Sequence, residues 1–336
     1  MVETRPTISV SLDALETLAL DALKATGLSN EHAAIIKDVL LYAELRDNSQ
    51  GLVKIVEGVV TPVAGAGAIE VEQKAPGIVR INGNQNVGMV VATRAAEEAG
   101  KLASTNGIGV AGTWNVSTST GAIGCYAEQM ALKGLIGIVM CGSPKVMAMA
   151  GGIDPVFGTN PIAIAAPTSA EPIVLDMATS AITFFEIVNA ARQGTEIPDG
   201  AAFDPDGNPT NDPEQALAGA MRTFDGYKAA GLALMLEIMT APLTGAGVVG
   251  DEDQSSNRGT LFIAIDPNAM IGQEAYLDAV DRMAERIRSG RPEVPGTPIT
   301  LPGERGRARV AAKKRAGTIE LDAELVEELR ALGAGK

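Results

Sequence analysis

The pattern of apolar residues along this chain predicts an α/β protein built around a largely buried sheet. Through the middle of the sequence, short runs rich in Val, Ile and Leu alternate with longer runs whose apolar residues recur at helical spacing. This alternation is typical of strands that are covered by helices. The 336 residues, 46% of them hydrophobic, are enough for one large or two medium-sized domains.

Two amphipathic helices are expected ahead of this alternating region. The first covers 11–27, where apolar residues share one face and Gly27 ends the helix. The second covers 30–45, with Ser29 as its N-cap. The segment 63–77, VAGAGAIEVEQKAPG, is interpreted as the linker to the alternating region.

The alternating region supplies six predicted strands and four predicted helices. The strands are expected at 77–84, 108–114, 135–141, 160–167, 172–177 and 260–267. The helices are expected at 87–107, 121–134, 179–194 and 225–239. Gly107 is placed to end the first of these helices, because glycine readily takes the left-handed conformation found at helix C-termini.

Beyond the last strand, a helix is predicted at 273–290, with Arg288 near its C-terminus, where the helix dipole favours a cation. The next residues are rich in Pro and Gly, and a short helix at 321–333 closes the chain. Between them lies RGRARVAAKKR, 305–315, which is locally basic in an acidic protein. A solvated basic segment is the simpler interpretation. The alternative is that Arg305 or a neighbour faces a cofactor phosphate.

The charge balance argues against polyanionic partners. There are 27 Lys and Arg against 41 Asp and Glu, so the net charge is −14 and the chain should repel nucleic acid and anionic lipid. The N-terminal residues show no basic leader with an apolar core, and no run of 18 apolar residues occurs. The two cysteines, Cys125 and Cys141, lack metal-ligand spacing and are expected to be reduced thiols in the cytoplasm.

Two familiar signals are set aside. GAGVVG, 245–250, formally matches the dinucleotide fingerprint, but a helix precedes it and an acidic irregular stretch follows, so it is predicted to be a loop. The single histidine, His32, falls in the first turn of a helix without partner residues and is predicted to be solvated.

Four stretches, 48–54, 151–161, 174–180 and 224–231, carry more polar and turn-forming residues than a core requires. Within them, Asp176 ends an apolar strand, where its carboxylate would be partly desolvated. Thr179 and Ser180 would offer backbone N–H groups to an anion if a helix began there. Lys228 could reach a phosphate or a carboxylate. Together these stretches predict a cleft that holds an anionic ligand.

Several blocks of sequence resemble the malate/L-lactate dehydrogenase family, which also contains ureidoglycolate, sulfolactate and diketogulonate dehydrogenases and cyclic-imine reductases. The blocks are GGIDPVFGTNPIAIAAP, PIVLDMATS, AAFDPDGNPTNDPEQA, FDGYKAAGLALMLEIMTAPLTGAG and LPGERGRAR. The resemblance runs over nearly the whole chain. It implies a mixed-sheet NAD(P)-binding domain that is not a Rossmann fold, at 75–267, and a mainly helical substrate and dimer domain formed by both chain ends, 1–74 with 268–336.

The same resemblance implies a homodimer, a small carboxylate substrate and a nicotinamide cofactor, with NADH or NADPH left open. The implied catalytic positions are Ser49, Gln50, Lys54, Ser119 and Asp176. The implied cofactor-binding positions are Thr159, Asn160, Asp176, Met177, Ala178, Thr179, Ser180, Tyr227, Lys228, Gly303, Glu304 and Arg305. Phe184, Phe185 and Met149 are candidates for the pocket wall. Phe185 and Glu186 stand where the family commonly has Gly-Lys.

This chain departs from the family at both histidines. The family usually reads S-H-G-x-x-R where this chain reads SQGLVK, so Gln50 replaces a histidine and Lys54 replaces the arginine. Ser119 falls at the second histidine position. Gln50 can orient a carbonyl group but cannot deliver a proton, and loss of a general acid costs roughly 100- to 10,000-fold in rate. Lys54 can neutralise a carboxylate without the two-pronged contact of a guanidinium.

Three interpretations remain open. In the first, a 2-oxo acid is reduced with another acid, which could be Lys54, Tyr126, or a water held by Ser49 and Asp176. In the second, the substrate is a cyclic or N-alkylated 2-imino acid whose C=N⁺ already carries its proton, and Asp176 favours that cation. In the third, the protein binds cofactor but is catalytically inert. The surviving polar set, Ser49, Lys54, Asp176 and Lys228, favours an enzyme.

Overall fold

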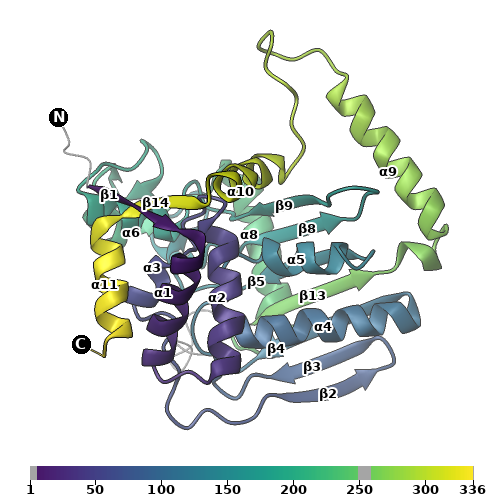
Figure 1. Cartoon of the computed structure of the whole chain (residues 1–336), viewed down its shortest axis with the longest axis horizontal. Coiled ribbons are helices and arrows are strands. Elements are labelled where there is room, and N and C mark those ends of the chain that lie inside the picture. Colours follow the sequence, from purple (N-terminus) through teal and green to yellow (C-terminus); the bar gives the residue numbers. More distant parts are fainter. Residues whose placement is uncertain (1–5, 249–258, 336) are drawn as a thin grey trace.

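A seven-stranded sheet runs through the middle of the molecule (Figure 1). The computed structural model describes residues 6–248 and 259–335. The strand order is β2 (Glu70–Ala75), β3 (Ile78–Asn82), β4 (Ile108–Trp114), β13 (Thr260–Ile265), β5 (Ile136–Cys141), β8 (Ile162–Ala166) and β9 (Ile173–Met177). Only the β3–β4 pair is parallel, so the sheet is mixed and mostly antiparallel. The α/β class is therefore confirmed.

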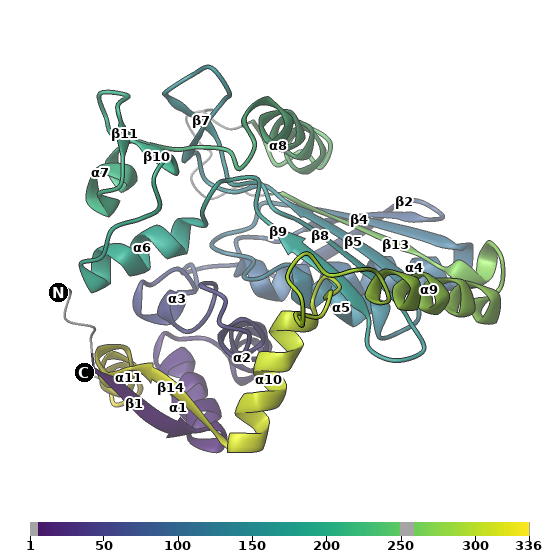
Figure 2. The ribbon, with the colours of Figure 1, turned by 90° about the horizontal axis from the view of Figure 1, so that it is seen from above.

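Helices cover both faces of this sheet (Figure 2). On one face lie α4 (Gly88–Asn106) and α5 (Gly124–Ala131), and on the other lies α8 (Gly226–Thr240). The approach of α4 is close because β4 carries Gly109, whose added Cβ would lie 2.0 Å from the carbonyl oxygen of Ala99. As predicted, α4 ends at Gly107 in the left-handed conformation.

Both ends of the chain build a second, helical layer. It contains α1 (Leu12–Ala25), α2 (Asn30–Glu44), the short α3 (Val53–Val56) and α11 (Ala323–Gly333). A two-stranded ribbon joins the ends, since β1 (Thr7–Ser11) pairs antiparallel with β14 (Thr318–Asp322). The predicted cap at Ser29 is confirmed, because its hydroxyl accepts a hydrogen bond from His32 N.

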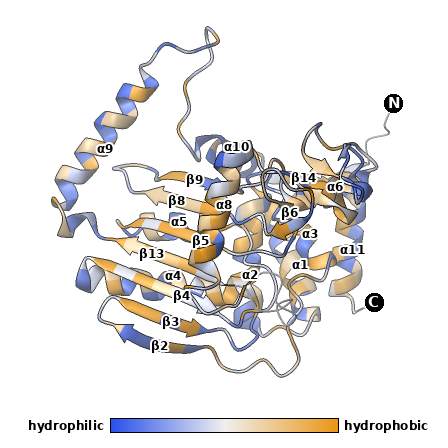
Figure 3. Ribbon diagram, turned by 180° about the vertical axis from the view of Figure 1, so that it is seen from behind, coloured by the Kyte–Doolittle hydropathy of each residue, from blue (hydrophilic) through white to orange (hydrophobic). Residues whose placement is uncertain are grey.

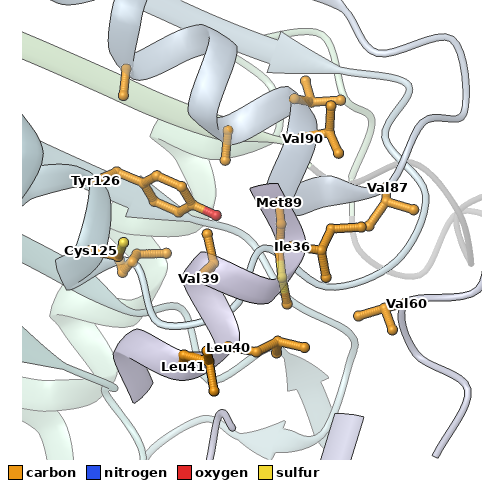
Figure 4. Packing of buried hydrophobic residues seen from close by; sticks show 14 of the residues in the cluster. Ile36, Val39, Leu40, Leu41, Val60, Val87, Met89, Val90, Cys125 and Tyr126 are labelled. Carbon is orange, nitrogen blue, oxygen red and sulfur yellow. The ribbon is translucent and has the colours of Figure 1, made fainter. Parts of the chain in front are cut away.

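The helical layer packs onto the sheet helices through one continuous apolar core (Figure 4). Ile36 and Val39 from α2 meet Met89 from α4 and Tyr126 from α5. All four side chains are almost fully buried. This packing fixes the loop that follows α2 relative to the sheet, and that loop contributes to the site described below.

A small five-stranded sheet lies beyond the ends of the main strands. Its order is β11 (Pro209–Thr210), β10 (Ala202–Phe203), β12 (Ala220–Met221), β6 (Met147–Ala148) and β7 (Pro155–Phe157). It packs with α6 (Phe184–Gln193) and α7 (Pro213–Ala218) around a separate apolar cluster. These strands were not predicted, because two- and three-residue strands carry no readable period.

After β13, a 3₁₀ turn η1 (Pro267–Ala269) leads to α9 (Gln273–Arg288), which projects from the body (Figures 1 and 3). Arg288 is its last residue, as expected. The chain then returns to α10 (Glu304–Ala316), which has no buried residue. The basic tract is helical and only partly solvated: Arg305 is exposed, whereas Arg307 and Lys313 donate hydrogen bonds to backbone carbonyl oxygens elsewhere in the chain.

Three further predictions need correction. The segment interpreted as a linker contains the edge strand β2, which the pattern hides because five of its six residues are exposed. The helix expected from 179 begins at Phe184, because Thr183 forms a capping box with Glu186. The terminal strands β1 and β14 were missed as well. Gly245 to Val248 form a non-helical loop as predicted, and 249–250 lie outside the described residues.

Candidate active site

A cavity of about 310 Å³ lies where the helical layer meets the ends of β5 and β9. Ligand sites in proteins span roughly 300–1,000 Å³, so this cavity suits a small acid with one ring beside it. The loop after α2, α3, the loop before α5 and the start of α6 complete its wall. The residues that line the cavity include Asn48, Gln50, Lys54, Ser119, Ser143, Thr159, Asp176, Met177, Ala178, Thr183, Phe184 and Phe185.

Lys54 is the buried cation of this cavity. Its side chain comes from α3 and is 1% exposed. The ammonium Nζ lies 2.9 Å from Ser119 Oγ, to which it donates a hydrogen bond, and 3.7 Å from the centre of the Phe185 ring. A ring face attracts a cation without neutralising it. Lys54 therefore places a buried ammonium group in the wall of the cavity.

The loop that carries Gln50 is held by a buried carboxylate. Glu44 Oε2 accepts a hydrogen bond from Leu52 N at 2.7 Å, and burial raises the pKa of Glu44 despite that bond. Gly51 is required here, because a Cβ on it would lie 2.0 Å from Glu44 Oε2. Gln50 lines the cavity, and Ser49 turns to Thr183 with 2.8 Å between their hydroxyl oxygens.

Asp176 lies near the end of β9 and faces the cavity. Solvent reaches its side chain through the cavity, while protein encloses it on the other sides. This desolvation raises its pKa from 3.8 to about 6, against the opposing effect of a 3.0 Å hydrogen bond from Gly124 N. The partly desolvated carboxylate predicted at this strand end is confirmed.

Thr159 and Asn160 border the site through a network beneath its floor. Thr179 is fully buried and donates its hydroxyl to the carbonyl oxygen of Thr159 at 2.8 Å. Asn160, also fully buried, donates to Glu237 Oε2 at 2.7 Å and has a φ of +30°. The idea that Thr179 and Ser180 form a helix N-terminus is wrong, since both are buried and the helix begins four residues later.

Tyr227 and Lys228 do not line this cavity. They lie in the first turn of α8, where Tyr227 is 76% exposed and Lys228 Nζ lies 3.5 Å from Asp225 Oδ2. The expectation that two lysines share the crevice with Asp176 is therefore wrong: Lys54 lines it, and Lys228 points to solvent. Met149 does not line it, whereas Phe184 and Phe185 do.

Tyr126 is excluded as the missing acid. It is fully buried, donates its hydroxyl to the carbonyl oxygen of Thr120 at 2.7 Å, and does not line the cavity. Burial also raises the pKa of Tyr126 well above its ordinary value. Its role is structural, and the only carboxyl group among the described lining residues is that of Asp176.

A second cavity of about 290 Å³ adjoins the first and shares Asn48, Asp176 and Thr183 with it. Its other lining residues include Arg46, Glu128, Gly303, Arg307 and Arg309. Arg46 Nη2 lies 2.9 Å from Glu128 Oε2, and Arg307 Nη1 donates to the carbonyl oxygen of Pro172 at 2.6 Å.

Three cofactor-binding positions were predicted in this region: Gly303, Glu304 and Arg305. Of these, only Gly303 lines one of the two cavities. Glu304 instead accepts a hydrogen bond from Leu301 N and pairs with Arg288. Arg305 is exposed and lines neither cavity. Residues two apart on a helix point in different directions, so Arg307 takes the place that was expected for Arg305. The sequence could not reveal this before α10 was recognised as a helix.

A buried lysine and a carboxyl group of raised pKa thus line one cavity, an arrangement suited to holding a small acid and exchanging a proton with it. Residues 10–330 match the family model described as malate/L-lactate dehydrogenase. The chain belongs to this family. The comparisons include malate/(S)-sulfolactate dehydrogenase from Methanothermus fervidus, 36% identical over 96% of both chains.

Two other relatives cover the chain almost completely. Delta(1)-pyrroline-2-carboxylate reductase 1 from Burkholderia ambifaria is 33% identical over 99% of each chain. The crystal structure of a dehydrogenase from Sinorhizobium meliloti superimposes with a TM-score of 0.88, at 32% identity, over 98% of this chain and 99% of that one. The family predicted from the sequence is thereby confirmed. No helix in the described ranges is long and apolar enough to cross a membrane.

Proposed function

We propose that this chain is an NAD(P)-dependent oxidoreductase that transfers hydride between the cofactor and a small 2-oxo or 2-hydroxy acid, or a 2-imino acid. One observation carries the proposal: Lys54 and Asp176 line the same cavity. A cation to hold a carboxylate and a group able to exchange a proton are the two functions that reduction of such an acid needs from the protein.

Lys54 binds the substrate carboxylate, with Ser119 positioning the ammonium. Gln50 orients the reacting end of the substrate: its amide N–H donates to a carbonyl oxygen, or its amide oxygen accepts from the N–H of a protonated imine. Asp176 supplies the proton. A pKa of about 6 leaves a useful fraction protonated near neutral pH, and an acid with a pKa near the working pH is the most effective proton donor. Asp176 thus replaces the two absent histidines.

The lining residues fit a nicotinamide dinucleotide across the two adjoining cavities. Thr159, Met177 and Ala178 offer a flat, mostly apolar wall for the ring in the first cavity. The second offers Arg46, Arg307 and Arg309, with the N-terminus of α10 at Gly303, to phosphate groups. Backbone approaches closely at Gly303, where a Cβ would lie 3.1 Å from the carbonyl oxygen of Val174. When bound, the cofactor supplies or accepts the hydride.

The mainly antiparallel sheet supports binding without a Rossmann glycine loop, since that loop needs a parallel strand followed by a helix. We therefore keep 75–267 as the proposed cofactor-binding domain and 1–74 with 268–336 as the proposed substrate and dimer domain. Tyr227 and Lys228 remain proposed contacts for an outlying part of the cofactor. The two buried free cysteines support a cytoplasmic location.

A homodimer is also part of the proposal. Helix α8 carries exposed apolar side chains at Leu234, Met235 and Ile238, and it is apolar on nearly all sides. Such a helix is normally buried. The projecting helix α9 adds exposed Met283 and Ile287. A second copy of the chain would cover these side chains.

A panel assay tests the function. Cofactor oxidation is followed with pyruvate, phenylpyruvate, pyrroline-2-carboxylate and piperideine-2-carboxylate, with NADH and NADPH in turn. Turnover of any of these acids supports the proposal. Faster turnover of imines than ketones identifies a dedicated imino acid reductase, in which ionised Asp176 stabilises the cationic substrate. Cofactor binding without turnover identifies the inert alternative.

The variant Gln50→His separates these cases further, with Gln50→Asn as the matched control. If the proton donor limits ketone reduction, the histidine should raise the rate on ketones by about tenfold or more and leave imines nearly unchanged. Asparagine should not raise either rate. Equal effects on both substrate types would show that proton delivery does not limit the reaction.

A further inference from the structure

The first cavity contains a single positive charge. Of its described lining residues, only Lys54, Asp176 and the thiol of Cys141 can ionise. Lys54 is held in place by Ser119 and by the Phe185 ring, with its Nζ 3.7 Å from the ring centre. One carboxylate can therefore be matched by one cation in this cavity.

The remaining described wall of the first cavity supplies no second cation: it combines apolar side chains with uncharged hydroxyl and amide groups such as those of Asn48, Thr118 and Ser143. Phe184 and Phe185 pack edge to face, with ring centres 5.7 Å apart, at the start of α6. Pro144 and Val146 face the same cavity from the loop after β5. A second anionic group on a substrate would lie against these apolar side chains, against uncharged hydroxyl or amide groups, or against the carboxyl of Asp176, and none of these carries a positive charge. A buried charge without a partner is strongly disfavoured in such surroundings.

The nearby arginines do not add a second positive charge to the first cavity. Arg46, Arg307 and Arg309 line the second cavity and not the first, and the proposed function assigns them to the cofactor phosphates. Asp176 lines both cavities. The carboxyl group of Asp176 is thus one of the three side chains, with Asn48 and Thr183, that lie between Lys54 in the first cavity and the arginines of the second.

We infer that the cavity selects acids with one carboxylate and an uncharged, apolar substituent, and that it discriminates against acids with two anionic groups. The inference rests on the proposed function and names its substrate class. It separates this chain from the relative named malate/(S)-sulfolactate dehydrogenase, since malate and sulfolactate each carry two anionic groups. The aromatic pair Phe184 and Phe185 is the element that sets this preference.

The test compares kcat/KM of the full-length protein for 2-oxovalerate with that for oxaloacetate and sulfopyruvate, which have a similar chain length. We expect 2-oxovalerate to be preferred by about 100-fold or more, with the difference mainly in KM. Oxaloacetate or sulfopyruvate turned over as well as 2-oxovalerate overturns this inference while leaving the proposed function standing. No turnover of any 2-oxo or 2-imino acid removes both.

A pair of variants at Phe184 tests the wall directly. Phe184→Arg places a second cation at the cavity, whereas Phe184→Met keeps it apolar. The arginine should raise the oxaloacetate to 2-oxovalerate ratio of kcat/KM by about tenfold or more, and the methionine should keep the wild-type order of substrates. A folded arginine variant with an unchanged ratio contradicts the role given to this wall. The wild-type comparison stands even if that variant does not fold.

Discussion

The charge of Asp176 depends on pH close to neutrality because desolvation by neighbouring groups raises the pKa of its carboxyl group, although the residue is exposed to solvent on the side of the cavity. The folded pKa of about 6 lies above the ordinary value of 3.8, so the folded state binds this proton more tightly than the unfolded state. Its contribution to stability is therefore fully present below the ordinary value and is lost as the pH rises through about 6. The same proton is the one offered to a substrate.

We therefore expect kcat/KM for ketone reduction to fall as the pH rises through about 6, and the reverse oxidation to rise over the same interval. Asp176→Asn should lower ketone reduction by roughly 100- to 10,000-fold and remove the inflection. Rates measured from about pH 5 to 8 check this. Asp225→Asn, at an exposed residue that lines neither described cavity, is the control. An inflection that survives in Asp176→Asn would assign the proton to another group.

Among single residues, the sequence predicted more of those that line the first cavity than of those that line the second. Gln50, Lys54, Ser119 and Asp176, which the family resemblance implied as catalytic positions, all line one cavity, and their catalytic roles stay a prediction. Arg307 was missed in favour of Arg305, since only the direction of a helix face separates them. The exposure of Lys228 could not be predicted from the sequence either, because it depends on which face of the sheet α8 covers.

At the scale of elements, the turn between α2 and α3 is the feature that positions Lys54. The carboxylate of Glu44 closes it by accepting from Leu52 N, and Gly51 leaves room for that carboxylate. A local pattern of polar residues predicts a turn. The preference for glycine at position 51 comes instead from its contact with the Glu44 side chain across the turn. The start of α6 also depends on a contact between side chains and backbone. Thr183 and Glu186 form a capping box that starts the helix at Phe184, whereas the apolar spacing alone had placed its start at 179.

Gly51→Ala should therefore move α3 and weaken substrate binding. The added methyl would meet Glu44 Oε2 at 2.0 Å and Glu44 Cα at 3.3 Å, so we expect KM to rise about tenfold and the free energy of unfolding to fall by roughly 1–3 kcal/mol. Substrate titration and urea unfolding measure the two effects. Gly231→Ala is the control, because nothing lies within 4 Å of its added Cβ. Equal behaviour of the two variants would refute the crowding argument.

At the scale of the whole molecule, the exposed side chains of α8 and α9 indicate a surface completed by a second chain. We expect a dimer in analytical ultracentrifugation, and a monomer for Met235→Glu with Ile238→Glu, because each charge would be placed in an apolar interface. Leu132→Glu, at a leucine that is even more exposed and lies at the end of α5 on the other face of the sheet, should leave the dimer intact. A monomeric wild type would contradict this expectation.

The overall plan was predictable because the long strands and helices have clear periods, and the family blocks fixed their order. The small sheet and the strands at the two ends were not, since each is two to five residues long and gains its partners only from distant parts of the chain.

The ribbon of β1 and β14 couples the first described residues of this protein to almost the last. During synthesis β1 has nothing to pair with until β14 has also been made, and contacts between such remote residues form slowly. The helical layer therefore stays incomplete until then, and removing either strand should disturb the other.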